Sequence, residues 1–316
     1  MDAGKSTIPD DAMVYVKGSL KLVKELKGMD LISAVSTGRV TRGPNKTIIP
    51  RGSYYTEKDL IPGDTDPEDT VILYQYGNRS IKRLPDGLVL KSGPSIRLAE
   101  AAAMDLAAKH GLPVPKSHGV CEPDQENGRR LGWIKMDFVE GTALEDVWAD
   151  LNKQEKLDIC HQLRDILIKM RTIEPPTQGT INSCDNSSIK DGRNISDYQG
   201  GPFKNETEFN EFILDFGARP PVALEQAIRN RMPTGHRTVL THCDLSPRNI
   251  MVRDGKITGL IDWEDGGFFP EYWEYVKFFE AFTKHRDWKD YSDEIMPQKY
   301  DDELLFFQVL LRWQRS

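Results

Sequence analysis

The alternation of apolar and polar positions divides the chain into a strand-rich first half and a helix-rich second half. After Asp11, apolar residues recur every three to four positions and predict an amphipathic helix near residues 12–27. From Val71 the period becomes that of strands: VILYQY, IKRLP and LVLK are separated by the turn sequences GNRS and PDG. These segments predict a three-stranded meander over residues 71–91.

The alanine-rich segment after the meander predicts a helix over residues 96–110. Ser95 stands where an N-cap is expected, and Gly111 stands where a helix C-terminus needs a left-handed residue. Two more strands, at 117–123 and 131–139, follow with a polar loop between them. The first half is therefore predicted to be mostly sheet.

Beyond the tripeptide EGT, helical signals dominate. Thr142 with Glu145, and Asn152 with Glu155, have the spacing of capping boxes. The second of these boxes predicts a helix over residues 153–173.

A long segment rich in Gly, Ser, Asn and Pro, residues 177–205, interrupts the helices. Loops of this length in compact domains are usually functional or disordered, so we expect substrate contacts there. Two helices, near 206–216 and 222–231, precede a strand, a loop and a hairpin over residues 238–262. The chain from Pro270 onward is predicted to be helical.

This order of elements fits an α+β protein of two unequal lobes. The predicted N-terminal lobe, residues 1–136, holds the N-terminal helix, the antiparallel sheet and the helix after it. A hinge at 137–141 leads to a mostly helical lobe of residues 142–316. The cleft between the lobes is the expected site.

Charge and composition argue against several kinds of partner. A net charge of -7 and a pI near 5.5 lack the positive potential that attracts nucleic acid or an anionic bilayer. No apolar run has signal-peptide character or approaches the ~20 residues that span a membrane, so we expect a cytoplasmic protein. The four cysteines have neither metal-type spacing nor the density of a disulfide scaffold, which predicts reduced thiols.

The candidate chemistry lies in the run HCDLSPRNIMVRDGKITGLIDWE. Asp244 and Asn249 have the D-x-x-x-x-N spacing of a kinase catalytic loop, where Asp accepts the acceptor's proton and Asn binds magnesium. Asp262 ends an apolar strand after a DG turn, where kinases keep the aspartate that binds the magnesium ion at the triphosphate. Order, spacing and predicted structure together indicate phosphoryl transfer.

Upstream residues supply a candidate nucleotide site. Lys91 ends the third strand, as does the kinase lysine that pairs with the α- and β-phosphates, and Glu100 in the next helix is placed to orient it. The turn with Gly77, Asn78 and Ser80 offers N–H groups to phosphates, although a G-x-G-x-x-G pattern is missing. Taken singly, Lys91 and Glu100 would each be interpreted as an ordinary solvated side chain.

Other features have structural interpretations. The GKS of residues 4–6 lacks the preceding strand and glycine of a Walker A loop. The HRD of residues 285–287 is followed five positions on by Ser292 rather than by Asn, so we expect a solvated helix end. His242 is expected to pack and orient the loop. The aromatic residues between 268 and 279 predict a core-packed helix, with an acceptor pocket as the alternative.

The run HCDLSPRNI followed by IDWE resembles the aminoglycoside phosphotransferase family, and SPRNIMV with EYWEYVK is similar to its fungal members. The resemblance covers about residues 70–285. It implies the bilobal protein-kinase-like fold, the cofactors ATP and Mg²⁺, and direct transfer to a hydroxyl without a covalent enzyme intermediate. It also implies that the backbone of Asp137 and Val139, in the hinge MDFVEG, binds adenine.

The predicted function is transfer of the γ-phosphate of ATP to a hydroxyl of a small molecule, with Asp244 as the base. A protein kinase is one alternative, although no APE segment follows Asp262. A nucleotide-binding pseudokinase or scaffold is another, but such proteins are expected to lack an essential residue, and Lys91, Asp244, Asn249 and Asp262 are all present. The acceptor, an aminoglycoside or another hydroxylated metabolite, stays open.

Overall fold

The computed structural model describes residues 12–16, 19–22, 55–56, 70–124, 131–193, 196–214, 221–232 and 234–314. The chain forms two compact units, one of residues 1–98 and 117–138, the other of residues 99–116 and 139–316. The division between residues 138 and 139 falls inside the predicted hinge. Residues 99–116, which the sequence prediction places in the N-terminal lobe, belong to the second of these two units. The lobe boundaries as a whole stay a prediction.

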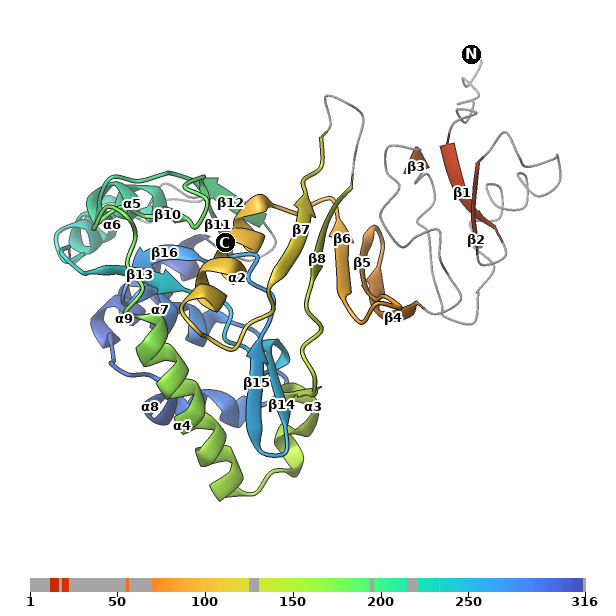
Figure 1. Ribbon diagram of the computed structural model, residues 1–316. Helices are drawn as coiled ribbons and strands as arrows, with labels where there is room; N and C mark the ends of the chain where they lie inside the picture. The colour runs from red at the N-terminus through yellow and green to blue at the C-terminus, as the bar shows by residue number, and fades with distance from the viewer. Residues whose placement is uncertain are drawn as a thin grey trace, which may run out of the picture. The chain divides into compact units, whose positions relative to one another are not determined.

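The N-terminal segment forms strands, so the helix predicted over residues 12–27 is wrong where the structure describes the chain. β1 (Ala12–Val16) pairs antiparallel with β2 (Ser19–Leu22) on one side and β3 (Tyr55–Thr56) on the other (Figure 1). The β-branched and aromatic residues of AMVYV favour an extended backbone, and strand pairing overrides the helical period. Residues 23–27 lie outside the described residues.

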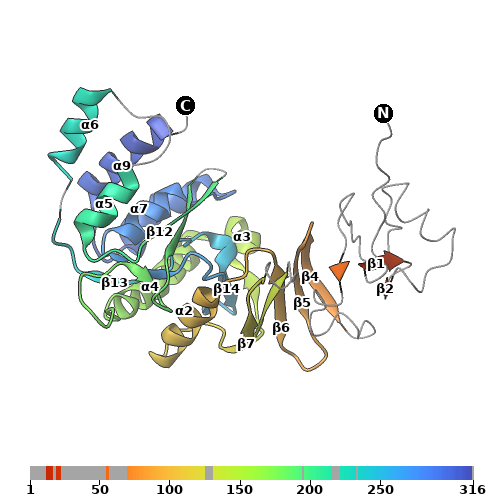
Figure 2. The same ribbon diagram turned by 90° about the horizontal axis from the view of Figure 1, so that it is seen from above.

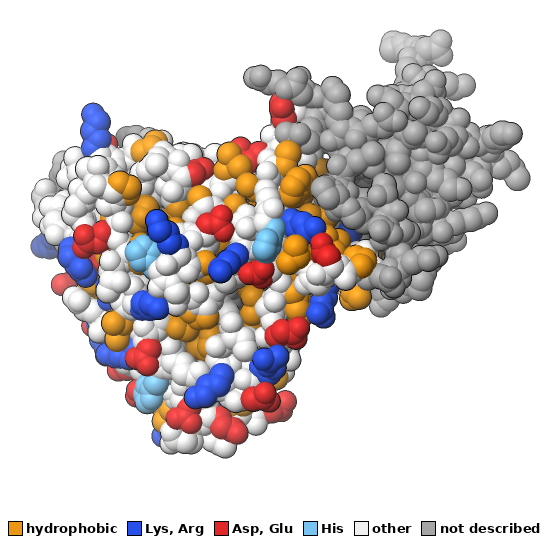
Figure 3. Space-filling view, viewed as in Figure 1, with side chains coloured by type: hydrophobic (Ala, Val, Ile, Leu, Met, Phe, Trp, Pro, Cys, Tyr) orange, Lys and Arg blue, Asp and Glu red, His pale blue; other side chains and the backbone are white. Residues whose placement is uncertain are grey.

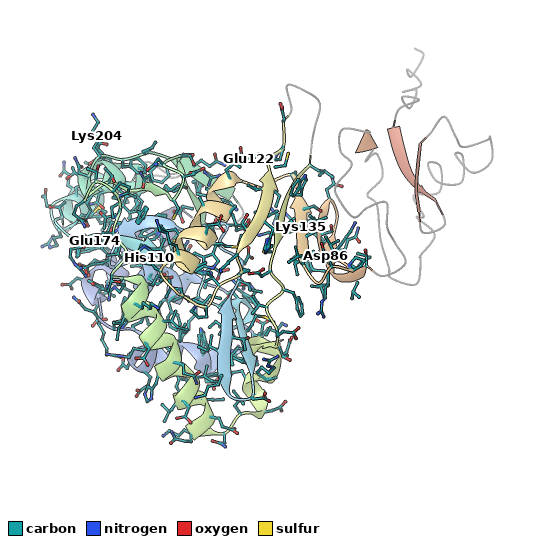
Figure 4. The ribbon with its side chains drawn as sticks, viewed as in Figure 1. Asp86, His110, Glu122, Lys135, Glu174 and Lys204 are labelled. Carbon is teal, nitrogen blue, oxygen red and sulfur yellow. The ribbon has the colours of Figure 1, made fainter. Side chains whose placement is uncertain are left out.

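The first unit contains a five-stranded antiparallel sheet in the order β4-β5-β6-β8-β7. The predicted meander and the two later strands are confirmed. The five strands are β4 (Val71–Tyr76), β5 (Arg79–Arg83), β6 (Val89–Gly93), β7 (Ser117–Cys121) and β8 (Gly132–Met136). Leu84, Leu90 and Leu131 form its buried cluster. Lys135 on β8 donates to Asp86, in the turn before β6, at 2.7 Å (Figure 4).

Capping explains where one long helix of the second unit begins. The Asn152 side chain accepts hydrogen bonds from the first turn of α4 (Lys153–Met170), and Glu155 Oε2 accepts from Asn152 N at 2.8 Å, which confirms that capping box. The box predicted at Thr142 is wrong. Thr142 lies in the short strand β9 (Thr142–Ala143) and pairs with the strand β14 described below, so its side chain does not cap the next helix.

The remaining helices are predominantly in the second unit, and two of the predicted ones, α5 and α6, are confirmed. The α-helices besides α4 are α2 (Leu98–Lys109), α3 (Leu144–Val147), α5 (Glu206–Leu214), α6 (Val222–Arg229), α7 (Trp273–Glu280), α8 (Ser292–Ile295) and α9 (Asp301–Gln314). The 3₁₀ helices are η3 (Trp148–Asp150), η4 (Pro247–Asn249) and η5 (Arg286–Tyr291).

The segment of residues 177–205 is more ordered than its composition suggests. It contains β10 (Asn182–Ser183) and a hairpin of β11 (Ile189–Arg193) and β12 (Ser196–Gly200). Gly, Ser and Asn have a low strand propensity, so the local sequence does not predict these strands. Pairing of β10 with the distant strand β16 described below, and ion pairs of β11 with distant charged residues, stabilise them.

Two short sheets carry the predicted catalytic loop. β13 (Thr238–Thr241) and β10 flank β16 (Gly267–Pro270), a strand that the sequence analysis missed because it is short and runs directly into helix. β14 (Ile250–Arg253) and β15 (Lys256–Leu260) form the predicted hairpin, with β9 on its other edge. The loop between β13 and β14 thus has a strand at each end.

Aromatic side chains from α5, α7 and α9 form a core, as predicted for the aromatic series. Ring centroids of Phe209 and Trp273 lie 5.0 Å apart, and those of Trp273 and Phe307 lie 5.1 Å apart. Figures 1 and 2 show these three helices side by side. Six members of the series are buried: Phe268, Phe269, Tyr272, Trp273, Tyr275 and Phe278.

None of the helices in the described ranges is long and apolar enough to cross a membrane. All four cysteines are free thiols, in agreement with the predicted absence of a disulfide framework. On the face drawn in Figure 3, cationic and anionic side chains are interspersed over the described surface.

Candidate active site

The loop between β13 and β14 holds the predicted catalytic aspartate in a hydrogen-bond network. Asp244 Oδ2 accepts from Arg248 Nη2 at 2.6 Å and from Asn249 Nδ2 at 2.9 Å. Asn249 Nδ2 also donates to the Asp244 carbonyl at 3.0 Å. Because η4 turns the chain between them, the predicted base and the predicted magnesium ligand are in direct contact.

Two buried polar atoms of this loop have no hydrogen-bond partner in the described part of the chain: Asp244 Oδ1 and Ser246 Oγ. Ser246 is 1% exposed. Buried polar atoms are normally paired in native structures, and each exception needs an explanation. Both atoms are out of reach of solvent, so the surrounding protein encloses them.

The β14–β15 hairpin places Asp262 next to Asn249. Ile261, the residue before Asp262, donates its N–H to Asn249 O at 2.9 Å. Asp262 has a φ of 64° and Cys243, before the base, has a φ of 70°. Left-handed backbone is uncommon outside glycine and persists where surrounding contacts hold it, often at functional sites. Of these two positions, Cys243 directly precedes the predicted base, and Asp262 is a predicted magnesium ligand.

His242 links the catalytic loop to this hairpin. Its Nε2 donates to Ile261 O at 3.0 Å, and its Nδ1 accepts from Asp244 N at 3.2 Å. These partners select the neutral tautomer with the proton on Nε2, because a carbonyl only accepts and an N–H only donates. Burial lowers the pKa of His242, against the opposing influence of Asp244. Trp263 packs edge-on against the ring at 4.6 Å, so the predicted packing role agrees with the geometry.

Glu274 on α7 supports the same loop and was missed by the sequence analysis. Its Oε2 accepts from His242 N at 2.6 Å, and its Oε1 accepts from Cys243 N at 3.1 Å. Burial raises the pKa of Glu274 to about 7, while the two backbone donors act in the opposite direction. No local pattern marks a buried glutamate among the aromatic residues of α7, so only the fold identifies it.

A buried lysine holds the segment that follows Asp262. Lys190 on β11 is 5% exposed, and its Nζ lies 3.3 Å from Glu264 Oε1 and 3.5 Å from Asp265 Oδ1. Burial raises the pKa of Asp265 to about 6, although Lys190 opposes the shift. The β11–β12 hairpin therefore restrains the chain two and three residues beyond the predicted magnesium ligand.

A second buried lysine joins the same hairpin to α7. Lys277 Nζ donates to Asp191 Oδ1 at 3.0 Å and to Glu280 Oε2 at 2.7 Å. Burial alone would lower the pKa of Lys277, but the two carboxylates outweigh it and raise that pKa. Neither lysine network was predicted, because the partners lie on elements far apart in the sequence.

The predicted phosphate-contacting residues of the first unit lie on the meander. Gly77, with a φ of 55°, and Asn78 form the turn between β4 and β5. Ser80 is buried, and its Oγ lies 2.8 Å from Ser92 Oγ on β6, so this hydroxyl is engaged within the sheet. Lys91 is half-buried on β6. Their contacts with a nucleotide stay predictions.

The other predicted nucleotide-site residues are placed as follows. Glu100 is 2% exposed in the first turn of α2. Asp137 Oδ1 lies 2.6 Å from His118 Nε2 in the first unit. Val139 begins the main part of the second unit. Pairing of Glu100 with Lys91, and adenine binding at Asp137 and Val139, stay predictions.

The HRD sequence of residues 285–287 lies at the beginning of η5. Asp287 accepts from Trp148 Nε1 at 3.1 Å and from Lys156 Nζ at 2.8 Å, which ties η5 to α4. The predicted position at a helix end is confirmed, whereas the absence of a catalytic role stays a prediction. The GKS of residues 4–6 lies outside the described residues.

The residues present fit a magnesium ion bound together with a nucleotide. Asn249 Nδ2 has two acceptors, so the amide directs its Oδ1 away from them and leaves that oxygen as a ligand. No group of three or more His, Cys, Asp or Glu side chains in the described ranges forms a closed metal site. Magnesium is commonly held by one or two protein oxygens plus phosphates and waters, so Asn249 and Asp262 suffice as a set.

Comparisons with known proteins agree with this arrangement. The model of the APH phosphotransferase enzyme family matches residues 76–293. The chain is similar to a variant of a thermostable aminoglycoside phosphotransferase APH(4)-Ia in ternary complex with ADP and hygromycin B, at 14% identity over 77% of this chain and 84% of that one, with a TM-score of 0.51.

A second APH(4)-Ia variant, in ternary complex with AMP-PNP and hygromycin B, matches at 14% identity over 77% of this chain and 83% of that one, with a TM-score of 0.50. These likenesses confirm the predicted α+β, protein-kinase-like fold. A search of curated proteins finds no significant match to the chain.

Proposed function

The chain belongs to the APH phosphotransferase enzyme family, and from that premise we propose that it transfers the γ-phosphate of ATP to a hydroxyl of a small molecule, with Asp244 as the base. One observation carries the proposal. Asn249 Nδ2 donates to Asp244 Oδ2 and to Asp244 O, and the residue before Asp262, Ile261, donates its N–H to Asn249 O, so the three residues of the predicted constellation adjoin one another. A carboxylate placed beside two candidate magnesium ligands is suited to accept the proton of an acceptor hydroxyl.

In the proposed reaction, the hydroxyl oxygen forms a bond to the γ-phosphorus while the bond to the β–γ bridging oxygen breaks. The hydroxyl proton moves to the Asp244 carboxylate, and ADP leaves with the electron pair of the broken bond. Bound Mg²⁺, held by Asn249 and Asp262, would neutralise negative charge on the phosphates. His242 and Glu274 keep the loop in position, since both bond to its backbone.

In the proposal, the nucleotide phosphates are bound at two places on the meander, Lys91 on β6 and the turn between β4 and β5. Lys91 pairs with the α- and β-phosphates, and Glu100 orients that lysine. The backbone of the turn at Gly77 and Asn78 covers the phosphates, with Ser80 behind the turn. The left-handed φ of 55° at Gly77 supports this part, because glycine allows the backbone to approach a ligand closely.

The hinge completes the nucleotide site in the proposal, with the backbone of Asp137 and Val139 bound to adenine. The two solved relatives contain ADP or AMP-PNP together with hygromycin B. By analogy with them, the donor here is an adenine nucleotide and the acceptor is a small hydroxylated molecule. The fungal character of the chain and its cytoplasmic location stay predictions.

A screen of hydroxylated compounds for ADP release from MgATP tests this function and identifies the acceptor. With an accepted compound, Asp244→Asn should lower turnover roughly 10²- to 10⁴-fold and leave ATP affinity nearly unchanged, because only the base is removed. Asp165→Asn, on the exposed face of α4, is the matched control and should retain the wild-type rate.

Three outcomes would contradict this proposal or favour one of its alternatives. Wild-type rates in both Asp244→Asn and Asp262→Ala with every accepted compound would show that the assigned roles are wrong. Stabilisation by MgATP in thermal melting, without turnover of any compound, would instead identify a nucleotide-binding pseudokinase. Phosphorylation of candidate proteins, detected by mass spectrometry, would identify a protein kinase.

A further inference from the structure

Arg248 connects the proposed base to the chain that follows α7. Its Nη2 donates to Asp244 Oδ2 at 2.6 Å, and its Nη1 donates to the backbone carbonyl of Phe282 at 3.0 Å. The side chain of Arg248 is 40% exposed and that of Asp244 is 22% exposed. One guanidinium therefore bridges two segments that are 34 positions apart in the sequence.

This bridge restrains the orientation of the Asp244 carboxylate. A carboxylate oxygen has two lone pairs in the plane of the group, and Asp244 Oδ2 already receives N–H donors from Arg248 and Asn249. Two donors on one oxygen also restrict rotation of the carboxylate about its Cβ–Cγ bond. The other oxygen, Oδ1, is left buried without a hydrogen-bond partner in the described part of the chain.

We propose that Arg248 is a positioning residue for phosphoryl transfer, which holds the Asp244 carboxylate in one orientation; this inference rests on the proposed function. The forked guanidinium suits the role because it engages the carboxylate and the Phe282 carbonyl through different nitrogens at once. A lysine at this position has a single nitrogen and loses that fixed geometry.

The competing explanation is an ordinary surface ion pair between residues four apart. Arg229 supplies a matched example: its side chain is 36% exposed, and its Nη2 lies 2.9 Å from Glu225 Oε1, also four positions away. Exposed pairs of this kind contribute little to stability, and Arg229 lies outside the catalytic loop. Arg229→Ala is therefore the control for Arg248→Ala.

The test uses MgATP as the donor and water as the acceptor, so that no acceptor compound is needed, and follows ADP release. Arg248→Ala is expected to lower kcat roughly 10- to 100-fold, the range that a small misplacement of a catalytic group produces. The KM for ATP should stay within about 2-fold, because Arg248 does not act on nucleotide binding in this account. Methylguanidinium should restore part of the rate to Arg248→Ala and leave the wild-type rate unchanged.

Arg248→Lys keeps the charge and serves as the second variant if Arg248→Ala does not fold, as judged by thermal melting. It should lower kcat at unchanged KM for ATP. Wild-type kcat in either folded variant, or a loss of rate equal to that in Arg229→Ala, overturns the inference while the proposed function stands. ADP release in the compound screen that is no faster in wild type than in Asp244→Asn overturns the proposed function, and the inference falls with it.

Discussion

Glu274 holds Cys243 in a left-handed backbone conformation. Cys243 has a φ of 70°, and its N–H donates to Glu274 Oε1 at 3.1 Å while the neighbouring His242 N–H donates to Oε2 at 2.6 Å. One buried carboxylate thus satisfies two consecutive N–H groups immediately before Asp244. The position of the proposed base depends on a residue of α7 that touches no reacting atom.

Glu274→Ala should destabilise the protein and lower phosphotransfer. The substitution leaves the N–H groups of His242 and Cys243 buried without an acceptor, at roughly 1–3 kcal/mol for each group. The free energy of unfolding in urea measures the loss. Glu208→Ala removes an exposed carboxylate that accepts from Lys204 N and should cost much less. Equal losses in the two variants would contradict the support role assigned to Glu274.

Gly141 and Gly255 give a matched pair of glycine substitutions. A Cβ on Gly141 would lie 2.5 Å from Val252 O at a φ of 131°, whereas a Cβ on Gly255, at a φ of 70°, would meet nothing within 4 Å. Gly255→Ala should therefore cost only the left-handed strain, about 1–2 kcal/mol. Gly141→Ala should cost clearly more and disturb the pairing of β9 with β14. Thermal melting of both variants gives the comparison, and an equal loss would refute it.

His236 should make the free energy of unfolding depend on pH above about pH 6.5. Its Nδ1 lies 2.8 Å from Glu206 Oε1 and its Nε2 lies 3.4 Å from Glu303 Oε1. The hydrogen bond to Glu206 raises the pKa of His236 from 6.5, and burial only partly offsets it. The imidazolium therefore stabilises the fold fully below pH 6.5, and this contribution is lost as the pH rises through the higher folded pKa.

Urea unfolding at a series of pH values tests this dependence. His236→Gln should flatten the decrease in unfolding free energy above pH 6.5. Glu303→Gln, which removes the more distant carboxylate, should flatten it less. An unchanged pH profile in His236→Gln would show that another group is responsible.

Lys277→Met should be among the most damaging substitutions in the second unit. It leaves the Asp191 and Glu280 carboxylates, 1% and 8% exposed, without their cation. Breaking a buried pair in this way typically costs about 3–5 kcal/mol. Lys284→Met is the control, because that lysine is 63% exposed, and removing its pair with Glu145 should cost much less. Similar unfolding free energies for the two variants would contradict the buried network.

Local signals predicted the elements whose residues are close in sequence. The meander over residues 71–91 is predicted from alternating apolar residues and turn residues. The capping box at Asn152 is predicted from a three-residue spacing, which is equally visible in the sequence. The helix predicted at residues 12–27 failed because AMVYV and SLKL carry a period that suits either structure. Pairing with β3, more than thirty residues away, favours the strands.

The sequence by itself predicted the candidate chemistry: the five-residue spacing places Asn249 in contact with Asp244, and a hairpin leads from Asn249 to Asp262. Only the tertiary structure decided which residues hold the Asp244 carboxylate and its loop in position. Glu274 lies 32 positions from His242, and Lys190 pairs with residues more than seventy positions away. Such contacts leave no local period, because burial and charge compensation depend on which distant elements pack together.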